Sequence, residues 1–217
     1  MAEKNSSKGQ MYITNMKNLK ILMFTIAAFT FTAGCQKTAA ESGVPNTLWY
    51  SKNPKAADFT ISNTDELAGL AQIVNGSWGG EPKEDDFSGK TITLKKNINL
   101  SVYDNWVPIG YAVDLDFYLR DKKTNPFSGT LDGGGFIISN LTINRPDSSA
   151  CQGPFGYISG AAVKNLALDN VNISGGNHVG TLAGIICCGS VTNSYSTGTV
   201  SGARRVKTEQ PGINAAE

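Results

Sequence analysis

The segments WVPIG (residues 106–110) and FSGTLDGGGFIISNL (residues 127–141), joined by a loop, decide the fold. Each contains a short strand next to turn residues, and the second segment resumes as another strand after its glycines. Asp132 precedes three consecutive glycines, which supply positive φ angles or allow very close approach of the backbone. Asp132 is therefore predicted to shape a turn rather than to carry chemistry.

Similar wording returns along the chain. FSG occurs at residues 87–89 and again at 127–129. Farther on, the dipeptides FG (155–156) and VG (179–180) lie 24 residues apart. A period in the twenties that combines short strands with turn glycines is typical of a stacked repeat. One repeat cannot bury its own apolar face, so the coils are expected to stack into a continuous core.

A second pair of dipeptides, KN (164–165) and TN (192–193), is separated by 28 residues. Asn165 and Asn193 would then occupy matching turns and form a ladder of asparagines along the stack. Apolar residues alternate with polar ones as in strands, and this predicts an all-β solenoid, a parallel β-helix, over residues 59–202. The side chains expected to face its interior are Phe87, Ile92, Leu94, Ile98, Leu100, Ile137, Leu141, Ile143, Val163, Leu166, Leu168, Val171, Ile173, Val179, Leu182, Val191 and Val200.

One helix is predicted, at about residues 64–75. Residues 59–61 read as a short strand, and Asn63 follows with Glu66 three positions on, which is the spacing of a capping box. Apolar residues then recur at helical spacing until Gly76 ends the helix. The open end of a solenoid exposes strand edges and apolar interior, so we expect this helix to cap the N-terminal end.

The N-terminal residues carry a targeting signal. Lys17 and Lys20 precede an apolar run at residues 21–34, which is too short for a comfortable membrane span and fits a secretory signal peptide. The run ends in TAGC (32–35), which resembles a bacterial lipobox with Thr32 in place of the usual leucine. That resemblance implies cleavage after residue 34 and lipidation of Cys35; an ordinary secretory peptide with an incidental cysteine is the alternative. Residues 35–58 are expected to be a tether.

Three further cysteines, Cys151, Cys187 and Cys188, are expected to be small apolar residues in or near the interior. An exported protein can form disulfides, but adjacent cysteines rarely bridge each other and the count is odd. His178 is the only histidine, and the cysteines lack the separated pairs of a zinc site. No metal or cofactor is expected.

The C-terminal coils carry a family likeness. GTLAG (180–184) and VTNSYSTGTVSG (191–202) resemble the GLUG motif, and residues 106–110 and 127–141 are similar to the segment that commonly precedes it. This resemblance implies a right-handed parallel β-helix in a bacterial surface protein. Relatives include adhesin-like proteins and non-catalytic parts of IgA-specific metallopeptidases, and the family offers no catalytic residues to transfer. The sequence departs from the pattern at IICC (185–188), where relatives often have a polar or glycine-rich turn.

The expected function is that of a lipid-anchored envelope protein, at the bacterial outer membrane or cell surface, whose solenoid is a non-catalytic adhesin-like binding or structural module. Its partner would be a protein or glycan of a host or bacterial surface. The contact candidates are Tyr111, Phe117 and Tyr118 in the loop 111–126, although these rings could equally pack the loop onto the solenoid. A net charge of +1 without a long basic run argues against nucleic acid as a partner.

A β-helix enzyme that cleaves polysaccharides is the alternative function. It would need clustered carboxylates, and the loop offers Asp114, Asp116 and Asp121 beside Arg120. Acidic residues in a solvated loop more often serve solubility. A zinc peptidase of the H-E-x-x-H type is excluded for this chain by its single histidine. Residues 203–217 drop the repeat pattern and could not add a coil, which favours a truncated chain.

Overall fold

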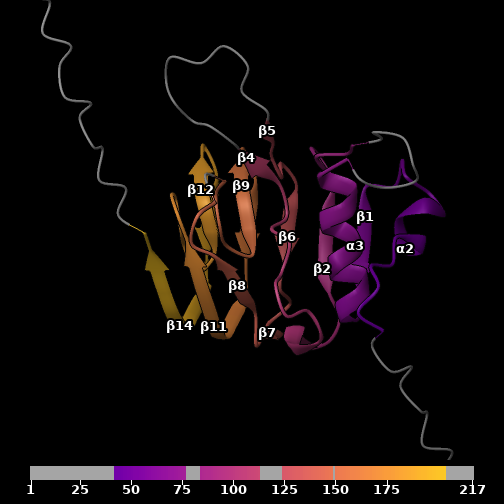
Figure 1. Ribbon diagram of the computed structural model, residues 1–217. Helices are drawn as coiled ribbons and strands as arrows, with labels where there is room; N and C mark the ends of the chain where they lie inside the picture. Colours follow the sequence, from indigo (N-terminus) through magenta and orange to yellow (C-terminus); the bar gives the residue numbers. More distant parts are fainter. Residues whose placement is uncertain (1–41, 77–83, 113–123, 149, 204–217) are drawn as a thin grey trace, which may run out of the picture. The chain divides into compact units, whose positions relative to one another are not determined.

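The computed structural model describes residues 42–76, 84–112, 124–148 and 150–203. Figure 1 shows short strands stacked side by side from the N-terminal to the C-terminal part of this region. One parallel sheet contains, in order, β1 (Asp58–Ile61), β2 (Thr91–Leu94), β6 (Thr130–Asp132), β10 (Ala162–Lys164) and β13 (Ser190–Thr192). A second contains β3 (Ile98–Asn99), β7 (Ile137–Ser139), β11 (Ala167–Gly175) and β14 (Tyr195–Gly202), with β8 (Thr142–Arg145) also paired to β11.

The third face is shorter. β9 (Phe155–Ser159) pairs in parallel with β12 (Ala183–Cys187), and isolated bridges from Ile109 and Phe127 extend this face toward the N-terminus. Each sheet pairs strands from successive passes of the chain, so the described residues form a β-solenoid of about four coils. The fold class predicted from the sequence, a parallel β-helix with a capping helix, is confirmed.

A column of phenylalanines runs through the interior. The ring centroids of Phe59 and Phe87 lie 5.7 Å apart, those of Phe87 and Phe127 6.3 Å, and those of Phe127 and Phe155 5.3 Å. These distances are typical of favourable aromatic pairs. The two FSG segments therefore recur because each places its phenylalanine in the same column.

Most side chains expected inside are buried, from Phe87 in the first coil to Ile173 in the third. Two corrections apply. In β7 the buried side chain is Ile138 and not Ile137, because the strand starts its alternation one residue later than expected. In the last coil Val191 and Val200 are exposed, since no further described coil covers them.

The predicted helix is α3 (Thr64–Val74). The Asn63 side chain accepts a hydrogen bond from the Glu66 N–H at 2.9 Å, and the Glu66 carboxylate accepts one from the Ser62 N–H at 2.7 Å. The Thr64 hydroxyl donates to the carbonyl of Asn99, the last residue of β3, at 2.9 Å. α3 therefore follows β1 and covers the N-terminal end of the second sheet, as expected of a cap.

The folded part begins earlier than residue 59. In the described part of the expected tether, a short helix α2 (Leu48–Ser51) buries Tyr50, and the ring of Trp49 packs edge-on against Phe59 at 5.4 Å. The Asn46 N–H also donates to the carbonyl of Asp65 at 2.7 Å. Residues 1–41, which include the expected signal peptide and Cys35, and residues 204–217 lie outside the described region.

The strand pairing corrects two further predictions. Phe155 pairs with Ala183, and Val179 forms a bridge with Gln152, so the FG and VG dipeptides do not occupy equivalent positions. Residues 185–187, which depart from the GLUG pattern, belong to β12 rather than to a turn. Hydrogen bonding across coils, and not the wording of the dipeptides, sets the register.

Candidate functional site

Two asparagine ladders follow corners of the solenoid. In the first, the Asn193 amide donates to Asn165 Oδ1 at 2.7 Å, and the Asn165 amide donates to Asp132 Oδ1 at 3.0 Å. Asn165 and Asn193 adopt φ angles of 53° and 48°, a left-handed conformation that asparagine tolerates better than most residues. The ladder predicted from the spacing of Asn165 and Asn193 is confirmed.

Asp132 forms the lower end of this first ladder. Hydrogen bonds from the Asn165 amide and the Gly134 N–H hold the pKa of its carboxyl below the usual range, and Lys164 adds an ion pair at 3.3 Å. A Cβ at Gly133 would overlap the carbonyl oxygen of Asn165. Asp132 therefore acts in the turn, as predicted, and the glycine after it allows close approach to the next coil.

The second ladder was not predicted. The Asn170 amide donates to Asn140 Oδ1 at 2.7 Å, and the Asn140 amide donates to Asn99 Oδ1 at 2.9 Å. Asn140 and Asn170 again have positive φ angles, of 58° and 52°. The signal in the sequence was an asparagine between apolar residues in each coil, but unequal coil lengths of 41 and 30 residues hide its period.

An open groove lies beside the first ladder, and we call it the corner groove. It encloses about 480 Å³. The ring of Tyr195 stands outward at one side, 61% exposed, next to Ala167 of the preceding coil. Its lining comes from three coils and consists of Gly135, Ile137, Asn165, Leu166, Ala167, Asn193, Ser194 and Tyr195. Amides, a hydroxyl and an exposed aromatic ring thus converge on one open surface.

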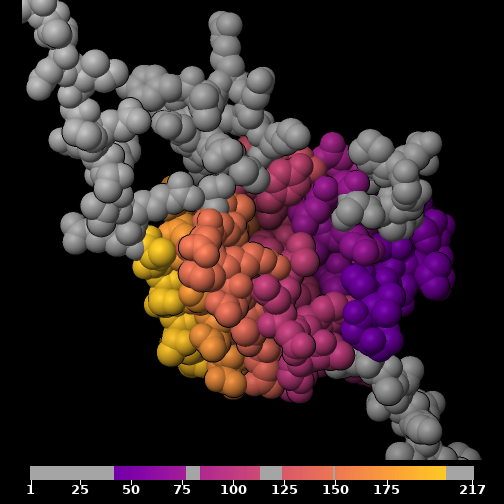
Figure 2. Space-filling model, in the orientation of Figure 1, coloured from indigo at the N-terminus to yellow at the C-terminus, as the bar shows by residue number. Residues whose placement is uncertain are grey.

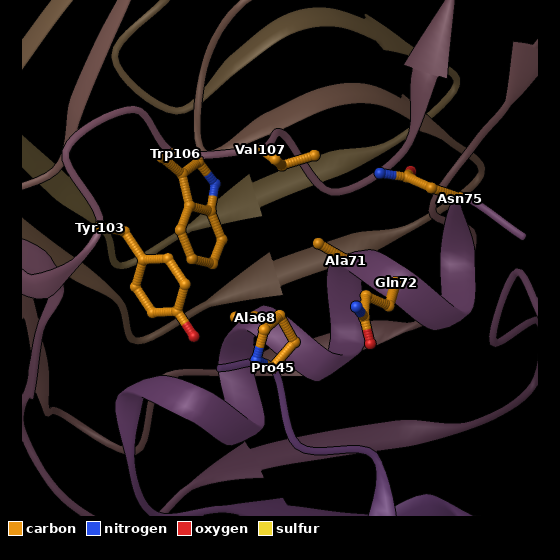
Figure 3. A pocket seen from close by; sticks show the side chains of 8 residues that line it. All are labelled: Pro45, Ala68, Ala71, Gln72, Asn75, Tyr103, Trp106 and Val107. Carbon is orange, nitrogen blue, oxygen red and sulfur yellow. The ribbon is translucent and has the colours of Figure 1, made fainter. Parts of the chain in front are cut away.

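A second hollow, of about 180 Å³, lies beside α3. Figure 3 shows the rings of Tyr103 and Trp106 on one side of it, with Ala71 and Asn75 of the helix opposite. The lining is mostly apolar, and the Trp106 ring is buried with its indole N–H bound to the Pro154 carbonyl at 3.1 Å. Because Trp106 is committed to the core, this hollow is a less suitable binding platform than the corner groove.

The contact residues predicted from the sequence are not brought together by the described structure. Tyr111 is half-buried in β4 (Tyr111–Ala112), which pairs in antiparallel fashion with β5 (Thr124–Asn125). Phe117 and Tyr118 lie outside the described residues, as do the loop residues Asp114, Asp116, Arg120 and Asp121. Sequence reasoning missed Tyr195, because an aromatic residue in a repeat strand is usually part of the core.

Two other aspartates support the N-terminal cap. Partial burial tends to raise the pKa of Asp85, but hydrogen bonds from Lys90, Tyr50 and the Phe87 N–H lower it below the usual range. Asp65 behaves alike: burial opposes its ionisation, while contacts from Ser42, Gly43 and Tyr103 lower its pKa. Both carboxylates are thus bound within the fold.

The thiols do not share one environment. Cys151 is buried, as expected, and burial raises its pKa to about 11. Cys187 and Cys188 are exposed, with their Sγ atoms 3.4 Å apart, so their predicted interior position is wrong. They lie at the end of β12 in the last described coil.

Among the described residues, no group of three or more His, Cys, Asp or Glu side chains is placed to hold a metal ion. The helices of this region are also too short or too polar to cross a membrane.

Comparison with known proteins gives one informative similarity. No family model matches the chain, and no solved structure matches it. The chain is 32% identical over 190 residues to Halomucin of Haloquadratum walsbyi (strain DSM 16790 / HBSQ001). The match covers 84% of this chain but 2% of Halomucin, so the chain corresponds to a small part of that protein.

Proposed function

We propose that this chain is a cell-surface lipoprotein whose β-solenoid is a non-catalytic, adhesin-like binding or structural module. The observation that carries the proposal is the corner groove, where amides and the exposed Tyr195 ring line an open surface across three coils. Such a surface suits a glycan, because amides and hydroxyls bond sugar hydroxyls while an aromatic face packs on the apolar side of a sugar ring.

Location at the cell surface is supported by two independent features. The chain resembles part of a protein named as a mucin, and its N-terminal residues resemble a lipoprotein signal that ends at Cys35. The likeness to the GLUG motif supports the same location. We include the lipid anchor at Cys35 in the proposal, with the outer membrane or cell surface as the site of attachment.

The anchor is tested by metabolic labelling with palmitate in a bacterial host. We expect the wild-type chain to be labelled and the Cys35→Ala variant to remain unlabelled. A Cys187→Ala variant serves as the matched control and should be labelled like wild type. Palmitate incorporation that survives Cys35→Ala would refute the anchor without affecting the solenoid.

Binding is tested on an array of glycans that includes mucin-type oligosaccharides. We expect Tyr195→Ala to lower the retained signal at least tenfold, while Leu48→Ala, which truncates an exposed side chain on α2, leaves it unchanged. A Tyr111→Ala variant tests the contribution of the loop. Equal binding by wild type and Tyr195→Ala would remove the corner groove from the proposal.

The same samples distinguish binding from cleavage. Bound glycans are incubated with the protein, and released reducing ends and unsaturated products are measured over time. A binding module releases neither product. Release that is abolished by Asp116→Ala would replace the proposal with a polysaccharide-cleaving enzyme whose acidic residues lie in the loop 111–126.

A further inference from the structure

The last described coil leaves interior positions uncovered. Val191 and Val200 are each 41% exposed, whereas the residues paired with them in the preceding coil, Val163 and Ile173, are each 1% exposed. Paired residues in parallel strands of one sheet face the same side. The two valines therefore point along the interior column, and their exposure arises because no described coil follows.

The third face repeats this arrangement. Ile186 is 44% exposed, while its partner Ile158 is 1% exposed. Between these side chains the end of the solenoid contains an apolar hollow of about 170 Å³. Its lining is Leu166, Leu168, Leu182, Val191, Ser194, Tyr195 and Ser196. The interior therefore reaches solvent at this end, which we call the open end.

The strand edges of the open end are unprotected. β12, β13 and β14 are each the outermost strand of their sheet, and no described strand pairs with their outer edges. Natural edge strands are usually guarded by lysine, other charges or proline. Residues 179–203 contain no charged residue and no proline. An edge with this composition is suited to pairing rather than protected against it.

The opposite end is covered. α3 packs its apolar face on the interior, and Thr64 caps the Asn99 carbonyl of β3. In Figure 2 the open end is the yellow coil at one side of the described region. Since only one end exposes interior and edges, association through it cannot propagate into a filament and closes at two copies.

We propose that the open end binds the open end of a second copy of this chain, giving a two-fold dimer in which the two interiors meet. Such a contact is self-complementary, because the same uncharged edge and apolar hollow occur on both sides. Antiparallel pairing of the meeting edges requires no crossover connection. The proposal does not rest on the glycan-binding function.

The chain's own C-terminal residues are unsuited to this role. Residues 204–217 contain five charged residues and only Val206 and Ile213 as large aliphatic residues. They lack the alternation of a strand and the length of a coil, which needs 28 residues between Asn165 and Asn193. A second copy supplies the matching surface that this segment cannot.

Sedimentation velocity of the full chain tests the proposal, in a nonionic detergent that shields the apolar run at residues 21–34. We expect a dimer at micromolar concentrations, and a monomer with unchanged circular dichroism for the double variant Val191→Lys, Val200→Lys. The matched control Val44→Lys, Leu48→Lys places two charges on exposed apolar residues near the N-terminal cap and should remain dimeric.

Cross-linking keeps the test valid if the charged variant misfolds. Cys187 and Cys188 are exposed on the last coil, so a short bis-maleimide should link two copies of the wild-type chain through these residues, as identified by peptide mapping. Cross-linked dimers that map to the open end support the proposal. A wild-type monomer throughout the micromolar range, a dimer that persists in the charged variant, or larger open-ended oligomers would overturn it.

Discussion

At the scale of single residues, corner asparagines link one coil to the next. Asn165 accepts from Asn193, donates to Asp132 and holds a left-handed backbone. An alanine there loses both hydrogen bonds and strains the turn. We expect Asn165→Ala to lower the free energy of unfolding by about 2–3 kcal/mol in denaturant titrations.

The comparison with Asn165→Gly separates the two causes. Glycine adopts the positive φ without strain but cannot form the ladder. Its loss of stability should be smaller by about 1 kcal/mol. If glycine and alanine destabilise the protein equally, backbone strain does not contribute at this corner.

Acid should destabilise the protein through its aspartates. The folded-state pKa values of Asp132, Asp85 and Asp65 lie below the ordinary value. Their contribution to stability is therefore complete above the unfolded pKa of about 4 and is lost as pH falls through the folded pKa. Unfolding followed between about pH 5 and 3 should show this decline, with a shallower slope for Asp132→Asn. A flat profile in wild type would contradict the assignment.

The thiols should differ in reactivity. Cys187 and Cys188 are exposed, whereas Cys151 is buried with a raised pKa, and the thiolate is the reactive form. Maleimide followed by peptide mapping should modify Cys187 and Cys188 in the native protein and Cys151 only after denaturation. Rapid native labelling of Cys151 would show that the interior beside β9 opens readily.

At the scale of elements, α3 was predictable within one residue because its signals are local. An N-cap, a capping glutamate and apolar residues at helical spacing occur together between Asn63 and Val74. The packing of residues 42–58 on the solenoid was not predictable, since it depends on contacts such as that between Trp49 and Phe59. Local patterns do not encode such distant partners.

Gly69 gives a sharp test of the cap. Helix propensity alone predicts that Gly69→Ala stabilises α3 by about 1 kcal/mol. However, a Cβ at Gly69 would overlap the carbonyl oxygen of Asn46, which is backbone and cannot move freely. We expect a net destabilisation of about 1–3 kcal/mol in chemical denaturation. Stabilisation would mean that the segment around Asn46 does not pack on the helix.

At the scale of the whole molecule, the sequence predicted the solenoid, its interior column and one of its two ladders. The order of glycines, asparagines and apolar residues is sufficient for this because every coil meets the same demands. The binding surface was placed differently, in the loop of Tyr111, Phe117 and Tyr118 rather than at the corner groove. A groove formed by three coils depends on register, and register depends on pairing between distant residues.

The register of stacking underlies both the ladders and the open end, and a pair of cysteines tests it most directly. Thr142 and Asn172 are paired in β8 and β11, and neighbouring strands lie about 4.8 Å apart, within reach of a disulfide. Oxidation of Thr142→Cys, Asn172→Cys should give an intramolecular disulfide between these positions, identified by peptide mapping. The control Thr142→Cys, Ser174→Cys, which is two residues out of register, should not. Efficient bridging in the control and none in the matched pair would contradict the solenoid described here.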